Sequence, residues 1–150
     1  MNYERVFQVA WGDLDANGHM RNTAYLDRCV DVRLGYFNEQ GVSPEDFARH
    51  QIGPVIARDD VEYFRELRLF DEVRVTFLLA GVSPNASRFQ FRHELFRADG
   101  KLAARVTTTG GWLDLRLRRL TAPPPGIGEA IDRLTHSDDF AALTDSVRKG

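Results

Sequence analysis

The residues best suited to chemistry in this chain lie in one segment, residues 11–25. It reads WGDLDANGHMRNTAY, and it places Asp13, Asp15 and His19 among glycines and an asparagine, which is typical of a loop. A helix is predicted to begin at the end of this segment. Helix N-termini present free backbone N–H groups and carry about half a unit of positive charge. A carboxylate can act as nucleophile or general base, and helix amides can stabilise an oxyanion, so the segment holds two of the parts that acyl transfer requires.

The helix after this loop is predicted over residues 22–40. Spacings of three and four place the following side chains on one stripe: Tyr25, Leu26, Cys29, Val30, Arg33, Tyr36 and Phe37. We expect Asn22 or Thr23 to cap its start and Gly41 to end it. Gly35 inside the helix predicts close packing against a sheet. At ~1.5 Å per residue the helix is roughly 30 Å long, which indicates a central element of the fold.

Most of the remaining chain is typical of strands. Alternating apolar residues predict strands over residues 3–11, 55–67, 72–79, 88–95 and 102–117. Turn residues at 81–85 and 98–100 separate the later strands, and Gly110 and Gly111 are expected to mark a bulge in the last one. Two strands have one apolar face each, formed by Val73, Val75, Phe77 and Leu79 and by Phe89, Phe91, His93 and Leu95. Because strands in hairpin succession pair antiparallel, the predicted fold class is α+β, with one long helix on an antiparallel sheet.

The C-terminal part of the chain is predicted to differ from the main body. Residues 121–126 contain three consecutive prolines, which cannot form regular helix or a central strand. Short helices are predicted over residues 126–134 and 138–148, the second capped by Asp138. We therefore divide the chain into a main body of residues 1–120 and an appendage of residues 121–150 that belongs to the same domain.

The overall composition excludes several classes of protein. The 150 residues have a mass of 17.1 kDa, which is the size of one domain. Lys and Arg number 20 against 22 Asp and Glu, so the formal charge of -2 does not favour nucleic acid as a partner. Cys29 is the single cysteine, which excludes an internal disulfide and a zinc site of paired cysteines. No signal peptide or membrane span is indicated, and we expect a cytoplasmic protein without metal or cofactor.

Within the loop and helix, the pattern D-x-x-x-H-x-x-N-x-x-Y-L is present without a gap. Its letters are Asp15, His19, Asn22, Tyr25 and Leu26. This pattern resembles that of the hotdog-fold acyl-CoA thioesterases of the 4-hydroxybenzoyl-CoA thioesterase type. The resemblance continues through VEYFR at residues 61–65 and LFDEVRV at residues 69–75, and it covers most of residues 3–118.

Two residues depart from the pattern of that family. Glu66 stands where the family often has proline, and Phe70 stands where it often has glycine. Both are predicted to lie at a connection between strands. The departures therefore bear on the local backbone more than on the chemistry.

The resemblance implies a fold, an assembly and an activity. The fold is an antiparallel sheet wrapped around one long central helix, and the protein is a homodimer or homotetramer whose sheets pair edge to edge, with the active site at the subunit interface. The activity is hydrolysis of a fatty or aromatic acyl-CoA to the free acid and CoA. Asp15 matches the catalytic aspartate, as nucleophile or general base, and the backbone N–H of Asn22 matches the group that polarises the thioester carbonyl.

Further site residues follow from the same resemblance and have ordinary structural alternatives. His19 either contacts substrate or orients the loop, and Tyr25 is either a substrate contact or a wall of the core. The family often contacts the nucleotide part of CoA at a turn that corresponds here to Asn85, Ser87 and Arg88. Asp13 and His93 are interpreted as a turn aspartate and a core histidine, respectively, and Cys29 as an inert buried thiol.

Other functions remain to be weighed against hydrolysis. The main alternative is a hotdog protein that binds acyl-CoA or an acyl carrier protein without hydrolysing it, and another is a purely structural dimer. Hydratases of the same fold use an aspartate and a histidine five residues apart with a proline between them, whereas Asp15 and His19 are four apart. The chain has no G-x-S-x-G, P-loop, dinucleotide or H-E-x-x-H motif.

Overall fold

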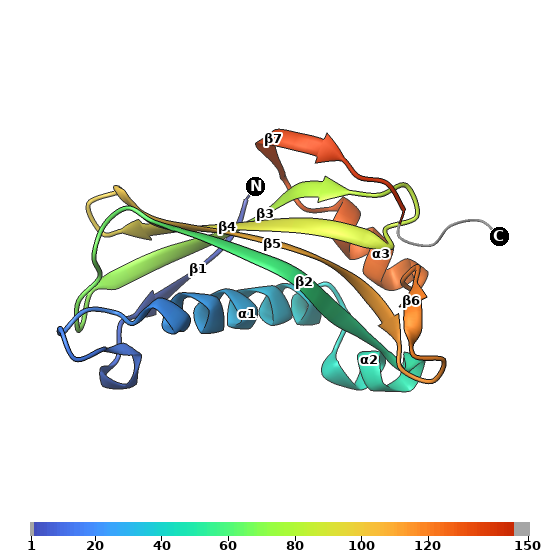
Figure 1. Ribbon diagram of the computed structural model, residues 1–150, viewed down its shortest axis with the longest axis horizontal. Coiled ribbons are helices and arrows are strands. Elements are labelled where there is room, and N and C mark those ends of the chain that lie inside the picture. The colour runs from blue at the N-terminus through green and yellow to red at the C-terminus, as the bar shows by residue number, and fades with distance from the viewer. Residues whose placement is uncertain (1, 146–150) are drawn as a thin grey trace.

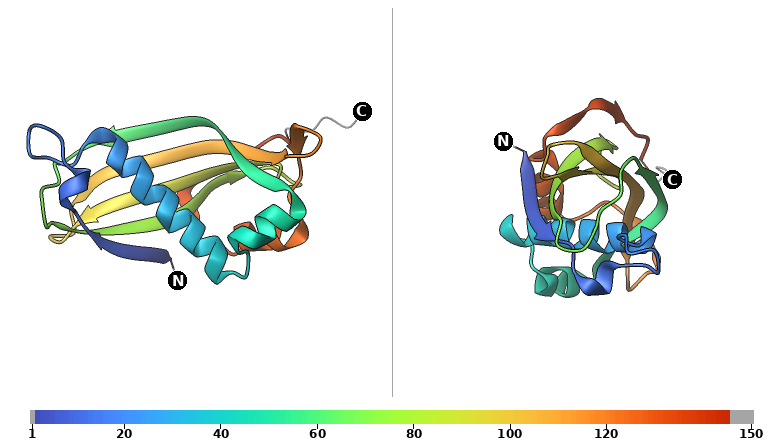
Figure 2. Two further views of the ribbon diagram at one scale, coloured as in Figure 1. Left: turned by 90° about the horizontal axis from the view of Figure 1, so that it is seen from below. Right: turned by 90° about the vertical axis from the view of Figure 1, so that its left-hand side faces the viewer.

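The computed structural model describes residues 2–145, in which one curved sheet packs against a long helix (Figure 1). The strands are β1 (Tyr3–Gln8), β2 (Ile52–Tyr63), β3 (Glu72–Val82), β4 (Arg88–Arg97), β5 (Leu102–Asp114), β6 (Arg119–Thr121) and β7 (His136–Ala142). The helices are α1 (Asn22–Glu39), α2 (Pro44–His50) and α3 (Pro125–Asp132), with a short 3₁₀ turn at Trp11–Asp13. Two further views show α1 crossing the inner face of the sheet, which curls around it (Figure 2).

The order of the strands differs in part from the predicted hairpin succession. The order is β1-β3-β4-β5-β2, with β6 on β5 and β7 on β3. The hairpins β3–β4 and β4–β5 are confirmed, but β2 pairs with β5 rather than with its neighbour in sequence, β3. An alternating pattern identifies a strand without identifying its partner, and residues 64–71 are too long for a tight hairpin turn. The pairing of β7 with β3 is parallel, an exception to the predicted antiparallel sheet.

Helix α1 is confirmed, and it buries one face against the sheet. Its buried residues are Ala24, Tyr25, Cys29, Val32, Arg33, Tyr36 and Phe37. A Cβ at Gly35 would lie 3.4 Å from the Tyr3 hydroxyl, so this glycine does allow a close approach by β1. The predicted cap is wrong, because Arg21 occupies the N-cap position and no side chain caps the helix. Gly41, with φ of +86°, follows the end of the helix as predicted.

The two central strands form the core that their patterns predict. The inner sets of β3 and β4 are each no more than 2% exposed, namely Val73, Val75, Phe77, Leu79, Phe89, Phe91, His93 and Leu95. Period-2 alternation at the centre of a sheet reports burial directly, because each strand has neighbours on both sides. The buried faces of these strands therefore form the part of the core against which α1 packs.

The predicted bulge at Gly110 and Gly111 is wrong. The irregular register lies in the partner strand β2, between Ile56 and Arg58. The two glycines serve a different purpose, because a Cβ at Gly110 would lie 2.2 Å from the Val55 carbonyl oxygen. They allow neighbouring backbones to approach closely.

The C-terminal region contains one predicted helix and one unexpected strand. Helix α3 is confirmed, and its residues Ile127, Ala130 and Ile131 are buried in the same core as the sheet. The helix predicted over residues 138–148 is wrong for the residues that the structure describes, because β7 occupies His136–Ala142. Residues 146–148 of that prediction lie outside the described residues. Pairing with β3 overrides the local helical pattern. Helix α2 was not predicted, although Ser43 and Asp46 form a capping box at its start.

Candidate active site

The loop before α1 is a compact turn held against the connection between β2 and β3. Leu14 and Met20 form an isolated bridge across the loop. The amide of Met20 donates to the carbonyl of Leu67 at 2.7 Å, and His19 forms a bridge with Arg68. Segments far apart in sequence therefore fix the position of the loop at one end of the sheet.

Asp15 is held in this loop by main-chain hydrogen bonds. Its amide donates to the carbonyl of His19 at 2.8 Å, and its Oδ1 accepts hydrogen bonds from the amides of Asn17 at 2.8 Å and His19 at 3.3 Å. No hydrogen bond within residues 2–145 uses Oδ2 of Asp15. One carboxylate oxygen thus orients the side chain while the other is available for chemistry, and the side chain is exposed in the single chain.

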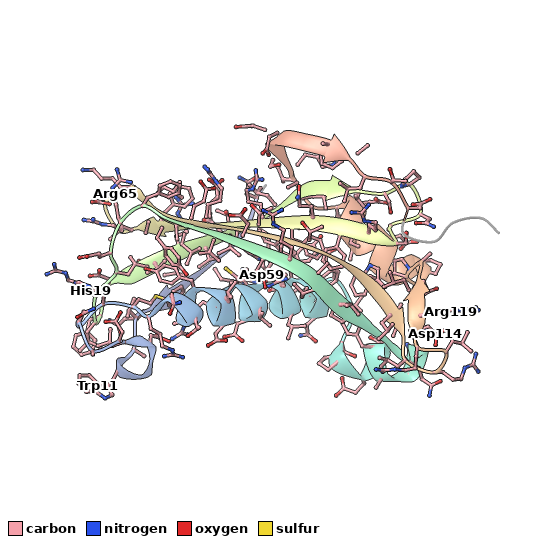
Figure 3. The ribbon with its side chains drawn as sticks, viewed as in Figure 1. Trp11, His19, Asp59, Arg65, Asp114 and Arg119 are labelled. Carbon is pink, nitrogen blue, oxygen red and sulfur yellow. The ribbon has the colours of Figure 1, made fainter. Side chains whose placement is uncertain are left out.

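A cleft of about 330 Å³ joins this loop to the start of α1 and the end of β2. It is lined by Asp15, His19, Met20, Asn22, Tyr25, Tyr63, Phe64, Arg65 and Glu66. The structure therefore brings together four of the residues that the sequence singled out, namely Asp15, His19, Asn22 and Tyr25. The view with side chains places His19 and Arg65 at this same end of the molecule (Figure 3).

Two tyrosines connect the cleft to the first residue of α1. The hydroxyl of Tyr63 donates to the carbonyl of Asn22 at 3.0 Å, and the ring of Tyr63 packs edge-on against Tyr25. Burial raises the pKa of Tyr25 to about 12, and the charges of Tyr63 and Asp15 act in the same direction. Tyr25 therefore stays protonated near neutral pH. Asn22 begins the helix, where the backbone N–H has no acceptor within the helix and can face a ligand.

Asp13 braces the loop rather than adding a second acid to the cleft. Its Oδ2 accepts hydrogen bonds from Arg28 at 2.6 Å and from the amide of Ala10 at 2.9 Å. Burial acts to raise the pKa of Asp13, but the hydrogen bonds from Arg28 and Ala10 outweigh it and lower the pKa. The carboxylate is thus ionised and held by an arginine and a main-chain amide, outside the lining of the cleft, which agrees with its interpretation as a turn aspartate.

Glu66 was noted in the sequence only as a departure from the family pattern. Its Oε2 lies 3.1 Å from Nε2 of His19, and it lines the cleft. A proline at this position could not make this contact. Neither Glu66 nor Tyr63 is near Asp15 in sequence, and only the fold brings them to it.

The residues predicted to contact the CoA nucleotide lie elsewhere in the chain. Asn85 and Ser87 lie in the turn between β3 and β4, and Arg88 is the first residue of β4, at the end of the sheet opposite to the loop of Asp15 (Figure 1). Oδ1 of Asn85 accepts from the amide of Ser87 at 2.9 Å, and Arg88 donates to the carbonyl of Thr144 at 3.3 Å. Within one chain they do not share a cleft with Asp15, and their contact with CoA stays a prediction.

A second cavity opens between α1 and the edge strand β2, with a volume of about 130 Å³. Half of its lining residues are aromatic, namely Phe37, Phe47, Phe89, Phe91 and Trp112. Among the described residues, Arg33 is the only charged one that lines it. Arg33 lies on the apolar stripe of the predicted helix, but no cavity was predicted from it. We call it the aromatic cavity.

Two buried groups lie in the core as predicted, although Nε2 of His93 has no hydrogen-bond partner within residues 2–145. The ring of His93 is fully buried, and its Nδ1 lies 2.9 Å from the carbonyl oxygen of Thr76. Burial, together with the charge of Arg33, lowers the pKa of His93 to about 3, so this side chain is neutral at neutral pH. Burial raises the pKa of the Cys29 thiol to about 12, which makes it unreactive.

Two further properties concern metals and membranes. No group of three or more His, Cys, Asp or Glu side chains in residues 2–145 is placed to hold a metal ion. Within the same residues, no helix combines the length and apolar character that crossing a bilayer requires.

The curved sheet around α1, with a polar loop at the start of that helix, defines the hotdog fold. The family model of the thioesterase-like superfamily matches residues 9–131, and the chain belongs to this superfamily. No match exists among the curated proteins.

Solved structures of similar fold include several thioesterases. A Staphylococcus aureus protein in complex with CoA has a TM-score of 0.82 at 21% identity, over 88% of this chain and 82% of that one. A 1,4-dihydroxy-2-naphthoyl-CoA thioesterase from Synechocystis has a TM-score of 0.80 at 19% identity, over 91% of this chain and 100% of that one. A gentisyl-coenzyme A thioesterase has a TM-score of 0.75 at 18% identity, over 85% and 98%.

Proposed function

We propose that this protein hydrolyses an acyl-CoA thioester, with Asp15 as nucleophile or general base. The observation that carries this proposal is that Asp15, with one unengaged carboxylate oxygen, lines the same cleft as Asn22, the first residue of α1. Membership of the thioesterase-like superfamily and the similarity to a structure in complex with CoA support the same assignment.

The chemistry follows from the properties of a thioester. Its carbonyl carbon is electrophilic, and the thiolate leaves readily because a thiol pKa of about 8.5 is low. Asp15 either attacks this carbon to give an anhydride, which water then hydrolyses, or removes a proton from the attacking water. The C–S bond breaks, and the thiolate takes a proton to give free CoA. The N–H of Asn22 stabilises the negative oxygen of the intermediate, an interaction of about 3 kcal/mol where the geometry is good.

The assembly we propose is a homodimer that pairs the two β2 edges. Within residues 2–145, strand β2 pairs only with β5, so its other edge is open in the described part of the chain. Exposed apolar side chains lie on β2 and α1: Val30, Leu34 and Ile56 line one cavity together, and Tyr63 lines the cleft with Phe64, the residue after β2. Strands β1, β6 and β7 also pair with one strand each, but they are shorter, with 6, 3 and 7 residues against 12 in β2. A long unpaired edge with an apolar border is a typical site of strand pairing.

Two-fold symmetry then decides which parts of the two chains meet. When a strand pairs antiparallel with its own copy, the end of one strand lies beside the start of the other. Tyr63, at the end of β2, belongs to the cleft of Asp15, whereas Pro54 and Ile56, near its start, line the aromatic cavity. The dimer would therefore place the cleft of one protomer against the aromatic cavity of its partner. It would also bring the turn that holds Asn85, Ser87 and Arg88 to the side where CoA must enter.

The function is tested by thiol release from a panel of acyl-CoAs with the wild-type protein and Asp15→Asn. We expect Asp15→Asn to lower kcat by about 10²- to 10⁴-fold, the usual contribution of a positioned base, while acyl-CoA binding measured by calorimetry is retained. Asp27→Asn is the matched control, because Asp27 lies on α1 with an exposed side chain outside the cleft. Equal rates for wild type and Asp15→Asn would remove Asp15 from the mechanism. Binding without turnover of any acyl-CoA would instead identify a non-catalytic acyl-binding protein.

A further inference from the structure

A cation is buried beside the aromatic cavity without an anion in contact. Arg33 on α1 is 8% exposed, and no hydrogen bond or ion pair within residues 2–145 uses its guanidinium. Its Nε is fully shielded and has no acceptor. A guanidinium stays charged in proteins, and burial of a charge is favourable only where an anion compensates it. The charge of Asp59 acts on Arg33, but within residues 2–145 no carboxylate forms an ion pair with it, so the guanidinium can accept a further anion.

The groups around Arg33 do not supply this anion. Cys29 and His93 are both neutral at neutral pH, since burial raises the pKa of the first and lowers that of the second. Asp59 on β2 is the carboxylate whose charge acts on Arg33. Its Oδ1 accepts a hydrogen bond from Thr108 at 2.6 Å, and it forms no ion pair with Arg33.

Trp112 lines the same cavity with its ring. Its Nε1 is shielded and has no hydrogen-bond acceptor within residues 2–145, so it does not offer a donor to the cavity. The aromatic wall together with the guanidinium of Arg33 fits a ligand that has an apolar body and carries an anionic oxygen group. A volume of about 130 Å³ is close to that of cavities that hold one benzene ring, which sets the size of that body.

We propose that the aromatic cavity receives the acyl group of the substrate, and that this acyl group carries a carboxylate, remote from the thioester, which pairs with Arg33. The proposal rests on the proposed function, in which the cavity of one protomer meets the cleft of Asp15 of its partner. The preferred substrates are then monothioesters of dicarboxylic acids with a short chain or a single ring. A neutral acyl group would leave the guanidinium without its anion, so it would bind less well.

The test compares acyl-CoAs of matched shape on the wild-type protein. The pairs are adipoyl-CoA with hexanoyl-CoA, and terephthaloyl-CoA with 4-methylbenzoyl-CoA. We expect kcat/KM to be about 10- to 100-fold higher for the carboxylate-bearing member of the better pair, the range of a charge-assisted hydrogen bond. The inactive variant Asp15→Asn should show the same order of affinities by calorimetry, which makes the preference measurable without turnover.

Substitution of Arg33 then locates the preference. Arg33→Met should lose the preference for the carboxylate-bearing acyl-CoA, because the cation that pairs with the carboxylate is gone: kcat/KM for adipoyl-CoA should fall towards that for hexanoyl-CoA. Arg33→Lys keeps a positive charge and should keep part of the preference. Arg49→Met removes one exposed positive charge from α2 and should keep the full preference. If Arg33→Met does not fold, the comparison of the matched acyl-CoA pairs on the wild type and on Asp15→Asn still shows whether a carboxylate on the acyl group is preferred.

Three results would overturn the proposal. The first is equal or better hydrolysis of the neutral acyl-CoAs by the wild type, which leaves the proposed function intact and removes the anionic substrate. The second is loss of the dimer in Arg33→Met without any substrate preference in the wild type, which would show that Arg33 pairs across the interface. The third is the absence of binding and turnover for every acyl-CoA, which would overturn the proposed function as well.

Discussion

Nε2 of His19 lies 3.1 Å from Oε2 of Glu66, so an ion pair or hydrogen bond joins the loop of Asp15 to the connection between β2 and β3. The two side chains are 30% and 62% exposed, and solvent weakens such pairs to about 0–1 kcal/mol. The groups that hold Asp15 belong to the main chain of Asn17 and His19 rather than to the ring of His19. The contact therefore positions the loop without fixing the catalytic carboxylate itself.

The first prediction follows from this division between ring and main chain. We expect His19→Gln to lower kcat by less than about tenfold, well below the 10²- to 10⁴-fold loss expected of a base in Asp15→Asn. Thiol-release kinetics measure this, and a double-mutant cycle with Glu66→Gln measures the coupling of the pair. A loss of kcat in His19→Gln as large as that in Asp15→Asn would place the imidazole in the reaction.

The second prediction concerns Phe70, which occupies a position where the family often has glycine. Its φ is +70° and its side chain is 68% exposed, so the residue is strained and its ring contributes little packing. We expect Phe70→Gly to raise the free energy of unfolding by about 0.5–1 kcal/mol, because glycine adopts this φ without steric cost. Urea denaturation measures the change. Phe70→Ala removes the ring but keeps Cβ, and an equal gain in this variant would show that strain is not the cause.

The third prediction concerns the open edge of β2. Ile56→Lys should raise the dissociation constant of the dimer by about 100-fold or more, because the new charge would be buried against the partner. Val6→Lys on the opposite edge strand β1 is the control, since Val6 is also exposed. Sedimentation velocity over a range of concentrations measures both. Dissociation of Val6→Lys with a stable dimer in Ile56→Lys would move the interface to β1.

The fourth prediction is a pH dependence of stability that arises from His93. Burial lowers the pKa of this histidine to about 3 from an ordinary value of 6.5, so between these values the unfolded chain binds a proton that the folded chain does not. The contribution of His93 to the free energy of unfolding is therefore fully present above pH 6.5. It falls as the pH drops from 6.5 towards 3, by at most about 1.4 kcal/mol per pH unit.

Comparison with His93→Gln isolates this contribution from that of the carboxylates. The variant has no imidazole to protonate, so its free energy of unfolding should decline less steeply between pH 6.5 and 4 than that of the wild type. Above pH 7 the two curves should run parallel. Equal slopes below pH 6.5 would mean that the imidazole is protonated as easily in the folded chain as in the unfolded one.

The elements that depend on local pattern could be predicted from the sequence. Helix α1 and strands β3 and β4 have clear periods, and turns beside them join neighbours in sequence. Asp15 and Asn22 are seven residues apart, so the loop and helix start could be combined without knowledge of the fold. The predicted second C-terminal helix was wrong because the contact that makes β7 a strand is with β3, more than fifty residues earlier.

The sequence by itself determined the period of α1, β3 and β4 and the pairing of a carboxylate with a helix start, because both depend on residues within a few turns of one another. Only the tertiary structure decided that β2 lies beside β5, and with it that Tyr63 and Glu66 complete the cleft. Only the tertiary structure also decided that Arg33 is buried without an ion pair, because strands β2, β4 and β5 enclose the cavity that it lines. These contacts join distant segments, and their free energy depends on the packing of the whole chain.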